Sequence, residues 1–397
     1  MITKIGSGLD PEKTTQAYID SLGIEALEKA AAYSSGSHWL LFAGLVVSAF
    51  VTWGIVRLGW LDQLEKKFGA SSALGIYCIG VVYTGVSALL SLPFTIYESW
   101  FRESSYGRTS QPLSDFLIQN FTSTILTALI TSLFFVFLYG LIRKTGRAWW
   151  LWSGGLAAAF IAIMMVVGPV YISPLFNEYK PLPEGEVRTE IEKIADKAGI
   201  PKDKIFVYDG SRQSENFTAN VAGIGGSARI AISDVALDKA SLDEVLAVTG
   251  HEAGHFVSGH IWRIIAVIAG LMMAGFFLAD RSFSFFARQF GSTAQLSSPS
   301  GLPVLIFIVS LFSVIGQPVM NGVTRIGELD ADVYSLETVG LPDGLASALL
   351  KTAEYRDPKA GDLQEFLFFS HPTVEKRILN AMRWKAKKES ALRKNKE

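Results

Sequence analysis

Residues 38–56 read "HWLLFAGLVVSAFVTWGIV", a run that contains no lysine, arginine, aspartate or glutamate. A helix that crosses a bilayer needs about 20 predominantly apolar residues, so this run can span a membrane. Five more runs of similar length follow, at 73–97, 121–142, 149–173, 261–279 and 302–320. The first four runs predict an N-terminal membrane domain. Glycine and polar residues interrupt the last two, so these fit either spans or helices buried in a core.

The composition also indicates a membrane protein. Of the 397 residues, 49% are apolar and 18% are charged, which is unusually apolar for a soluble chain. Tryptophans gather near the ends of the apolar runs, where amphipathic rings favour the membrane interface: Trp39, Trp53, Trp60, Trp149, Trp150 and Trp152. The formal net charge of −1 gives no basis for nucleic-acid binding. We therefore predict a mainly α-helical polytopic protein embedded in the lipid bilayer.

A polar, patterned segment separates the fourth and fifth apolar runs. Val187, Ile191, Ile194 and Ala198 fall on one face of a predicted helix. Short strands are predicted at 204–209 and 229–234, with a third in "FTANVAGIGG" between them that runs into a glycine turn. This pattern indicates an α+β domain. The predicted division of the chain is an N-terminal amphipathic or soluble segment, a four-span membrane domain, and a domain interrupted by two spans: 1–37, 38–173 and 174–397.

Three of the five histidines lie in "TGHEAGHFVSGH" (249–260). The surrounding stretch 241–262 has a helical pattern, and Ser241 with Glu244 forms a capping box at its start. His251 and His255 are four residues apart, so both imidazoles project from one face and can coordinate one zinc ion. Glu252 lies beside them and can deprotonate a water molecule. The spacing predicts a hydrolytic zinc site.

His260 does not fit the three-histidine pattern HExxHxxGxxH, because Gly259 stands at +8 and His260 at +9 from the first histidine. It is interpreted as a histidine at the helix end or as a contact of a ligand. Gly254 either permits close backbone approach or is a tolerated helix glycine.

A third ligand is predicted in "NGVTRIGELDADVYSLE" (321–337), just after the sixth apolar run. Glu328 and Asp332 are four apart on one helix face. A glutamate ligand beside an aspartate that orients an imidazole is a recurrent arrangement at zinc sites. A solvated acidic helix is the alternative.

Several motifs together resemble the type I CAAX prenyl protease family of integral-membrane zinc metalloproteases. The similarity covers roughly residues 38–385, and the motifs stand in the family's order. They are "LPFTIYESW" (92–100), "ISPLFNEYKPLPEGEV" (172–187), the strand region 204–234, "HEAGH", "ELDAD" and "HPTVEKR" (371–377). The resemblance implies a zincin-like α+β catalytic domain in a protein of six to seven transmembrane helices. Six apolar runs are found here, so the first span of the family would be either missing or replaced by the amphipathic stretch 13–32.

The resemblance also implies roles for individual residues. His251, His255 and Glu328 would bind one Zn²⁺ per chain, and Glu252 would be the general base. Asp332 would orient a ligand histidine. His371 and Arg377 would lie near the substrate carbonyl. The strand near Asn220 would bind an extended peptide along its edge. From the sequence alone, His371 could instead be a surface histidine that caps a helix.

The expected activity is cleavage of peptide bonds in membrane-associated substrates, with CAAX-type prenylated proteins as one substrate class. The alternative is a broader quality-control protease for membrane proteins, without prenyl specificity. A zinc transporter would place its ligands inside the spans, whereas HExxH precedes the fifth run. A catalytically dead scaffold would usually lose Glu252, which this chain keeps.

The charge distribution bears on orientation. The tail from Lys376 to Glu397 carries nine lysines and arginines and two acids, which favours a cytoplasmic C-terminus. The basic segment "RKTGR" (143–147) would then face outward, which the positive-inside rule disfavours. With the family resemblance, we expect the catalytic domain and C-terminus of a multi-pass protein to face the cytoplasm, at the plasma or inner membrane or the endoplasmic reticulum.

Overall fold

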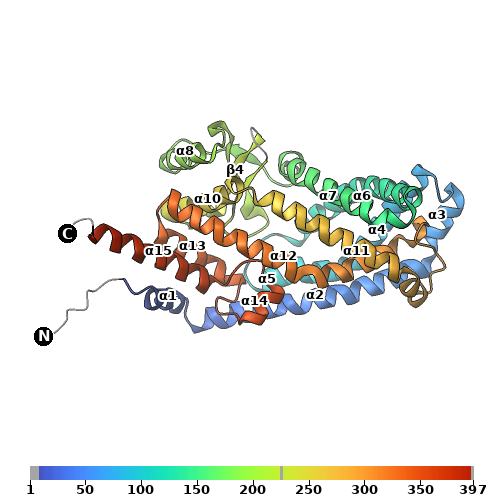
Figure 1. Ribbon diagram of the computed structural model, residues 1–397, viewed down its shortest axis with the longest axis horizontal. Coiled ribbons are helices and arrows are strands. Elements are labelled where there is room, and N and C mark those ends of the chain that lie inside the picture. The colour runs from blue at the N-terminus through green and yellow to red at the C-terminus, as the bar shows by residue number, and fades with distance from the viewer. Residues whose placement is uncertain (1–8, 224–226, 395–397) are drawn as a thin grey trace. The chain divides into compact units, whose positions relative to one another are not determined.

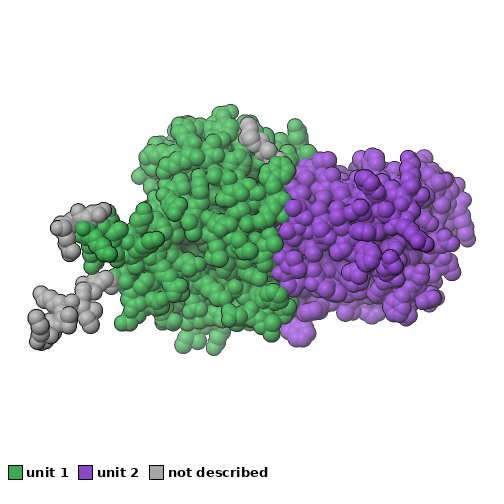
Figure 2. Space-filling model, in the orientation of Figure 1, with its two compact units in different colours: residues 1–37, 166–263, 321–397 green, residues 38–165, 264–320 purple. Residues whose placement is uncertain are grey.

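The computed structural model describes residues 9–223 and 227–394 and divides into two compact units (Figures 1 and 2). Unit 1 comprises Met1–Ser37, Val166–Arg263 and Asn321–Glu397, and unit 2 comprises His38–Met165 and Ile264–Met320. The unit boundaries fall within or beside long helices.

Six helices in the described part of the chain are long and apolar enough to cross a membrane. They are Ile24–Leu58, Ala73–Ser105, Leu113–Lys144, Gly146–Leu175, His260–Phe290 and Pro299–Thr338. They contain α2 (Ile24–Leu58), α4 (Ala73–Ile96), α5 (Arg102–Ser105), α6 (Leu113–Lys144), α7 (Trp149–Val167), α11 (His260–Phe290) and α12 (Leu302–Thr338). The predicted polytopic helical fold is confirmed, and several helices extend beyond the apolar runs; α2 and α12 do so with segments that belong to unit 1.

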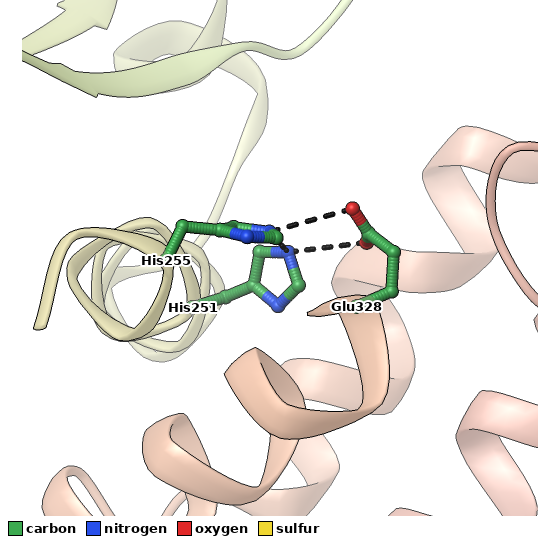
Figure 3. Close-up of side chains that lie close together, drawn as sticks. All are labelled: His251, His255 and Glu328. Carbon is green, nitrogen blue, oxygen red and sulfur yellow. Dashed lines mark hydrogen bonds and ion pairs between the residues drawn. The ribbon is translucent and has the colours of Figure 1, made fainter. Parts of the chain in front are cut away.

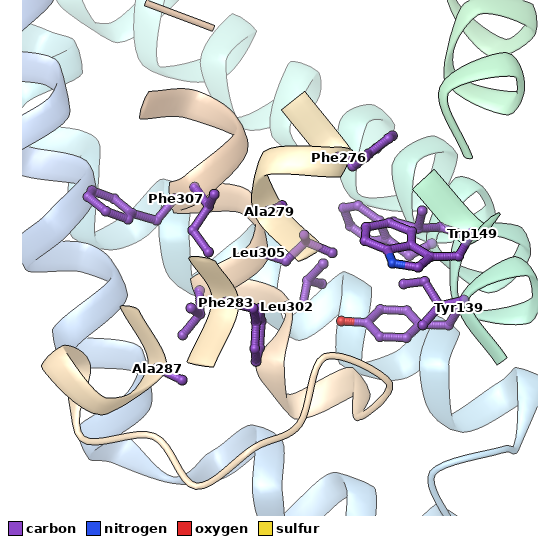
Figure 4. Packing of buried hydrophobic residues seen from close by; sticks show 14 of the residues in the cluster. Tyr139, Trp149, Phe276, Ala279, Phe283, Ala287, Leu302, Leu305 and Phe307 are labelled. Atoms are coloured by element: carbon purple, nitrogen blue, oxygen red, sulfur yellow. The ribbon is translucent and has the colours of Figure 1, made fainter. Parts of the chain in front are cut away.

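Unit 2 is a helical bundle built from these apolar segments and the short helix α3 (Trp60–Phe68). Its core includes Tyr139, Trp149, Phe276 and Leu302 (Figure 4). The indole nitrogen of Trp149 donates a hydrogen bond of 2.7 Å to Asp280 Oδ1. An unpaired polar group is costly among apolar helices, and this bond satisfies two such groups at once.

Unit 1 contains a four-stranded mixed sheet in the order β1-β2-β4-β3. The strands are β1 (Tyr179–Pro181), β2 (Ile205–Tyr208), β3 (Ala219–Ala222) and β4 (Arg229–Ser233). Three of them were predicted, and β1 was not, because "YKP" is too short to show alternation. The predicted glycine turn after β3 includes residues 224–226, which lie outside the described residues.

Helices cover the sheet and complete unit 1. They are α1 (Pro11–Asp20), α8 (Glu186–Ala198), α9 (Asp234–Lys239), α10 (Leu242–Val257), α13 (Pro342–Lys351), α14 (Asp362–Phe368) and α15 (Val374–Lys394). The apolar face predicted for 187–198 packs into one core with β2 and β4. Gly199 ends α8 in the left-handed conformation, with φ of 71°, as its sequence indicates.

The structure groups the chain differently from the predicted three domains. Ile19, in the segment predicted to stand apart, is fully buried against α13 and α15. The helical segment 264–320 belongs to unit 2 and separates two parts of unit 1 in the sequence, as in the expected interruption by two spans. The N-terminal segment joins unit 1 because apolar faces pack with the nearest apolar partners, whatever their order in the sequence.

The prediction of one continuous helix over 241–262 is wrong at its C-terminal end. The capping box of Ser241 and Glu244 is present, but α10 ends at Val257 and α11 begins anew at His260. Gly259 adopts a φ of 63°, which glycine tolerates and other residues rarely adopt. The chain direction therefore changes between His255 and His260.

Candidate metal centre

Two helices from distant parts of the sequence approach closely in unit 1. A Cβ atom added to Gly254 of α10 would lie 3.0 Å from the Cα atom of Ala331 in α12. One turn earlier, a Cβ atom on Gly250 would lie 2.9 Å from Ser335 Oγ. Glycines four residues apart share a helix face, so they create a flat surface for α12. Gly254 therefore permits close backbone approach and is not merely a tolerated helix glycine.

We expect Gly254→Ala to destabilise the protein by about 1–3 kcal/mol, since the added methyl group overpacks this contact. It should also reduce metal content by separating the candidate ligands on α10 and α12. Thermal unfolding and metal analysis of the purified protein measure both effects. Gly270→Ala is the matched control, because a methyl group there meets no atom within 4 Å. Wild-type melting and zinc content in Gly254→Ala would contradict the role of this contact.

The close approach brings His251, His255 and Glu328 together (Figure 3). The Nε2 atoms of the two histidines lie 3.1 Å apart. His251 Nε2 lies 3.3 Å from Glu328 Oε2, and His255 Nε2 lies 3.4 Å from Glu328 Oε1. Three potential ligand atoms thus converge on one point from two helices.

The separations fit a tetrahedral zinc ion. Ligand atoms at about 2.0–2.2 Å from a tetrahedral zinc lie about 3.3–3.6 Å from each other, close to the observed spacings. Glu328 Oε2 is buried and forms no hydrogen bond with a described residue; its ion-pair contacts, His251 Nε2 and Arg377 Nη1, are each 3.3 Å away. A metal cation would satisfy this oxygen more fully, since a buried carboxylate oxygen without a hydrogen bond is costly. Two imidazoles and a carboxylate are a usual zinc ligand set.

Asp332 and Arg377 contact His251 and Glu328 and hold them in place. Asp332 Oδ1 lies 2.9 Å from His251 Nδ1, so His251 can donate to it and present Nε2 to the centre. Arg377, 5% exposed, donates to Asp332 from Nε at 2.8 Å and from Nη2 at 2.7 Å. Its Nη1 lies 3.3 Å from Glu328 Oε2. Arg377 thus braces Asp332 and Glu328, and it also lines the cavity beside them.

The cluster favours positive charge at its centre. Burial alone would lower the pKa of His251, but the nearby carboxylates of Asp332 and Glu328 raise it to about 9. Carboxylates that stabilise a proton on an imidazole also stabilise a metal cation at the same position. Burial raises the pKa of the Glu252 carboxyl. A raised pKa makes this carboxylate a stronger proton acceptor when it is ionised.

A cavity of about 180 Å³ opens beside His251 and Glu328 in unit 1. Both Glu252 and His371 line it. His371 Nε2 lies 3.1 Å from Glu328 Oε1, and its Nδ1 lies 2.8 Å from Ser370 Oγ. Partial burial lowers the pKa of His371 despite the contact with Glu328, so its neutral form is favoured. The structure therefore places His371 at the cluster, whereas a helix cap on the surface was the alternative.

Asn220 lies in β3, opposite Ala231 of β4. The cavity is lined by the residues just before it, Phe217, Thr218 and Ala219. β3 stands at the end of the sheet, and among the described residues no strand pairs with its other edge. The strand is suitably placed for edge pairing, while Asn220 itself is one residue beyond the cavity lining.

Membrane-spanning helices combined with a buried His–His–Glu cluster and a HExxH glutamate define a membrane-embedded metallopeptidase. Comparison with known proteins agrees. Residues 181–385 match the model of peptidase family M48, and residues 11–178 match the model described as CAAX prenyl protease N-terminal, five membrane helices. The described residues in that second range contain four candidate spans.

Individual known proteins are also similar to this chain. The chain is 30% identical to the CAAX prenyl protease 1 homolog of Arabidopsis thaliana, over 89% of this chain and 87% of that protein. It is 27% identical to the uncharacterized metalloprotease YhfN of Bacillus subtilis, over 89% and 85%. The crystal structure of S. mikatae Ste24p shares the fold, with a TM-score of 0.72, 21% identity, and 94% and 95% coverage. This chain therefore belongs to peptidase family M48 and is an integral-membrane, multi-pass metalloprotease that acts on peptide or protein substrates.

Proposed function

We propose that this protein is a zinc metalloendopeptidase that cleaves membrane-associated substrates with Glu252 as general base. The observation that carries the proposal is the convergence of His251 Nε2, His255 Nε2 and the Glu328 carboxylate within 4.8 Å of one another, beside a cavity lined by Glu252. One zinc ion per chain fits this ligand set.

A bound zinc ion would supply a Lewis acid that polarises the scissile carbonyl and acidifies water. The protein's own residues would transfer protons and orient the metal ligands. Glu252 takes a proton from the attacking water and later delivers it to the nitrogen of the leaving amine. Asp332 keeps His251 in the Nε2-binding orientation, and Arg377 fixes Asp332 and Glu328.

His371 is proposed to donate a hydrogen bond to the oxyanion that develops on the carbonyl oxygen. Ser370 Oγ lies 2.8 Å from Nδ1 and can donate to it, which leaves the proton of neutral His371 on Nε2. That Nε2–H group faces the cluster, 3.1 Å from Glu328 Oε1. A fixed donor aimed at developing charge stabilises the transition state more than the bound substrate.

We expect His371→Ala to lower kcat by around a hundredfold, the usual effect of losing an oxyanion donor. KM should change little, and zinc content should stay near that of the wild type, because His371 is not a proposed ligand. Steady-state kinetics with metal analysis provide the measurement. A wild-type kcat in the zinc-loaded variant would show that His371 has no such role.

The substrate is proposed to bind as an extended strand along β3. The edge of β3 that pairs with no described strand offers backbone donors and acceptors next to the residues that line the cavity. Edge pairing recognises the peptide backbone and leaves side-chain choice to pockets. Prenylated CAAX-type peptides are the first candidate substrates, because several relatives are named CAAX prenyl proteases. A quality-control protease without prenyl specificity is the alternative.

Two peptides of identical sequence, one prenylated and one not, separate these substrate classes. A CAAX-type protease should cleave the prenylated peptide with a much higher kcat/KM and leave the plain peptide nearly intact. Equal cleavage of both peptides would favour the quality-control activity. Glu252→Gln protein serves as the control for contaminating proteases in both assays.

The catalytic unit and C-terminus are proposed to face the cytoplasm. The basic tail from Lys376 to Glu397 supports this orientation through the positive-inside rule. A reporter fused after Glu397 that is active only in the cytoplasm should be active. Activity of a reporter that works only outside the cytoplasm would reverse the orientation.

A further inference from the structure

His255 makes a second contact, through the ring nitrogen that faces away from Glu328. Its Nδ1 atom lies 2.8 Å from Nδ1 of His260, and the two rings meet edge to face with centroids 4.9 Å apart. His260 is 5% exposed. In an uninterrupted helix, residues five apart would point about 140° away from each other. The turn at Gly259 removes that constraint and lets the two rings meet.

The contact between two Nδ1 atoms restricts where the protons are. A histidine that binds a metal through Nε2 carries its remaining proton on Nδ1. His255 must then donate from Nδ1, and His260 must accept at Nδ1. Neutral His260 therefore carries its own proton on Nε2. That nitrogen lies 3.6 Å from Asp330 Oδ2, a carboxylate that attracts the N–H group through its charge.

The surroundings of His260 hold it in this place. Arg263 Nη1 lies 3.6 Å from the same Asp330 oxygen. Across from both, Gly327 of α12 leaves the space that the ring needs. A Cβ atom on Gly327 would lie 3.3 Å from His260 Nδ1 and 2.9 Å from Arg263 Nη2. The position of His260 is therefore set by contacts between two helices, α11 and α12.

We propose that His260 is a positioning residue of the metal centre: it accepts a hydrogen bond from His255 Nδ1 and so holds His255 Nε2 toward the metal. The inference rests on the proposed function, because it takes His255 as a ligand. The two histidine ligands then have different supports. His251 donates to the carboxylate of Asp332, whereas His255 donates to a neutral imidazole.

The test measures zinc affinity of the full-length protein in detergent, by competition with a chromophoric chelator. His260→Phe keeps a ring but has no acceptor, and we expect its zinc affinity to fall about tenfold or more, as for other contacts of metal-bound histidines. His260→Asn places an amide oxygen as many bonds from Cβ as Nδ1 is and should recover most of the affinity. His260→Gln places its oxygen one bond further out and should not.

The outcomes separate this inference from the proposed function. Wild-type protein that binds no zinc overturns both. Wild-type protein that binds zinc, with equally tight binding by His260→Phe, overturns the inference alone. If His260→Phe does not fold, as judged by its thermal unfolding, the Asn and Gln variants decide. Equal zinc affinities in those two variants would contradict a hydrogen bond at the Nδ1 position.

Discussion

Glu252→Gln should retain about one zinc per chain and lose peptide cleavage by roughly a thousandfold or more, within the range for loss of a general base. The amide keeps the shape of the side chain but cannot accept a proton from water. Glu252 is not one of the three converging ligands, so the metal site should survive. Metal analysis and single-turnover cleavage of a peptide, on the same preparation, measure both quantities.

The matched control is Glu244→Gln, a second glutamate in α10. It lies at the start of the helix, where its carboxylate accepts from the backbone N–H of Ser241 and pairs with Lys351. This change should lower stability and leave turnover per zinc unchanged. Glu252→Gln protein that cleaves peptide at the wild-type rate would rule out the general-base role.

Glu328→Ala is expected to have the largest effect on metal binding. It removes the third proposed ligand and leaves Arg377 without one of its two carboxylate partners. Removal of one partner from a buried charge pair is strongly destabilising, so stability should fall as well. Zinc should be lost at chelator concentrations that the wild type withstands, together with activity. Glu328→Gln, which keeps the volume and one oxygen, should bind zinc more weakly than the wild type and more tightly than Glu328→Ala.

Glu337→Gln provides the control on the same helix. Glu337 lies in α12, is exposed and stands more than two turns beyond Glu328. It should bind zinc and turn over like the wild type. Wild-type zinc affinity in a folded Glu328→Ala protein would mean that the third ligand lies elsewhere.

Local spacing made much of the site predictable. His251 and His255 share a helix face, as do Glu328 and Asp332, because both pairs are four residues apart. The structure brings these two pairs together, as expected from the sequence. The pairing of the helices also left a signal, since Gly250 and Gly254 follow the same spacing on α10. The membrane spans were predictable because a bilayer requires long apolar runs.

Features that depend on tertiary contacts could not be predicted in the same way. Arg377 pairs with Asp332 and Glu328, more than forty residues earlier, and no periodic pattern connects these positions. The turn at Gly259 was missed because a single glycine is also tolerated inside a helix, and its positive φ appears only in the structure. Without that turn, the contact between His255 and His260 could not be anticipated.

The central claim is that His251, His255 and Glu328 hold one zinc ion on which peptide cleavage depends. Its most direct test is to remove the metal from purified wild-type protein with a chelator and to restore it by titration, with cleavage of a prenylated peptide as the readout. We predict that cleavage stops on removal and returns in full at about one zinc per chain. Undiminished cleavage by protein shown to be metal-free would contradict the account.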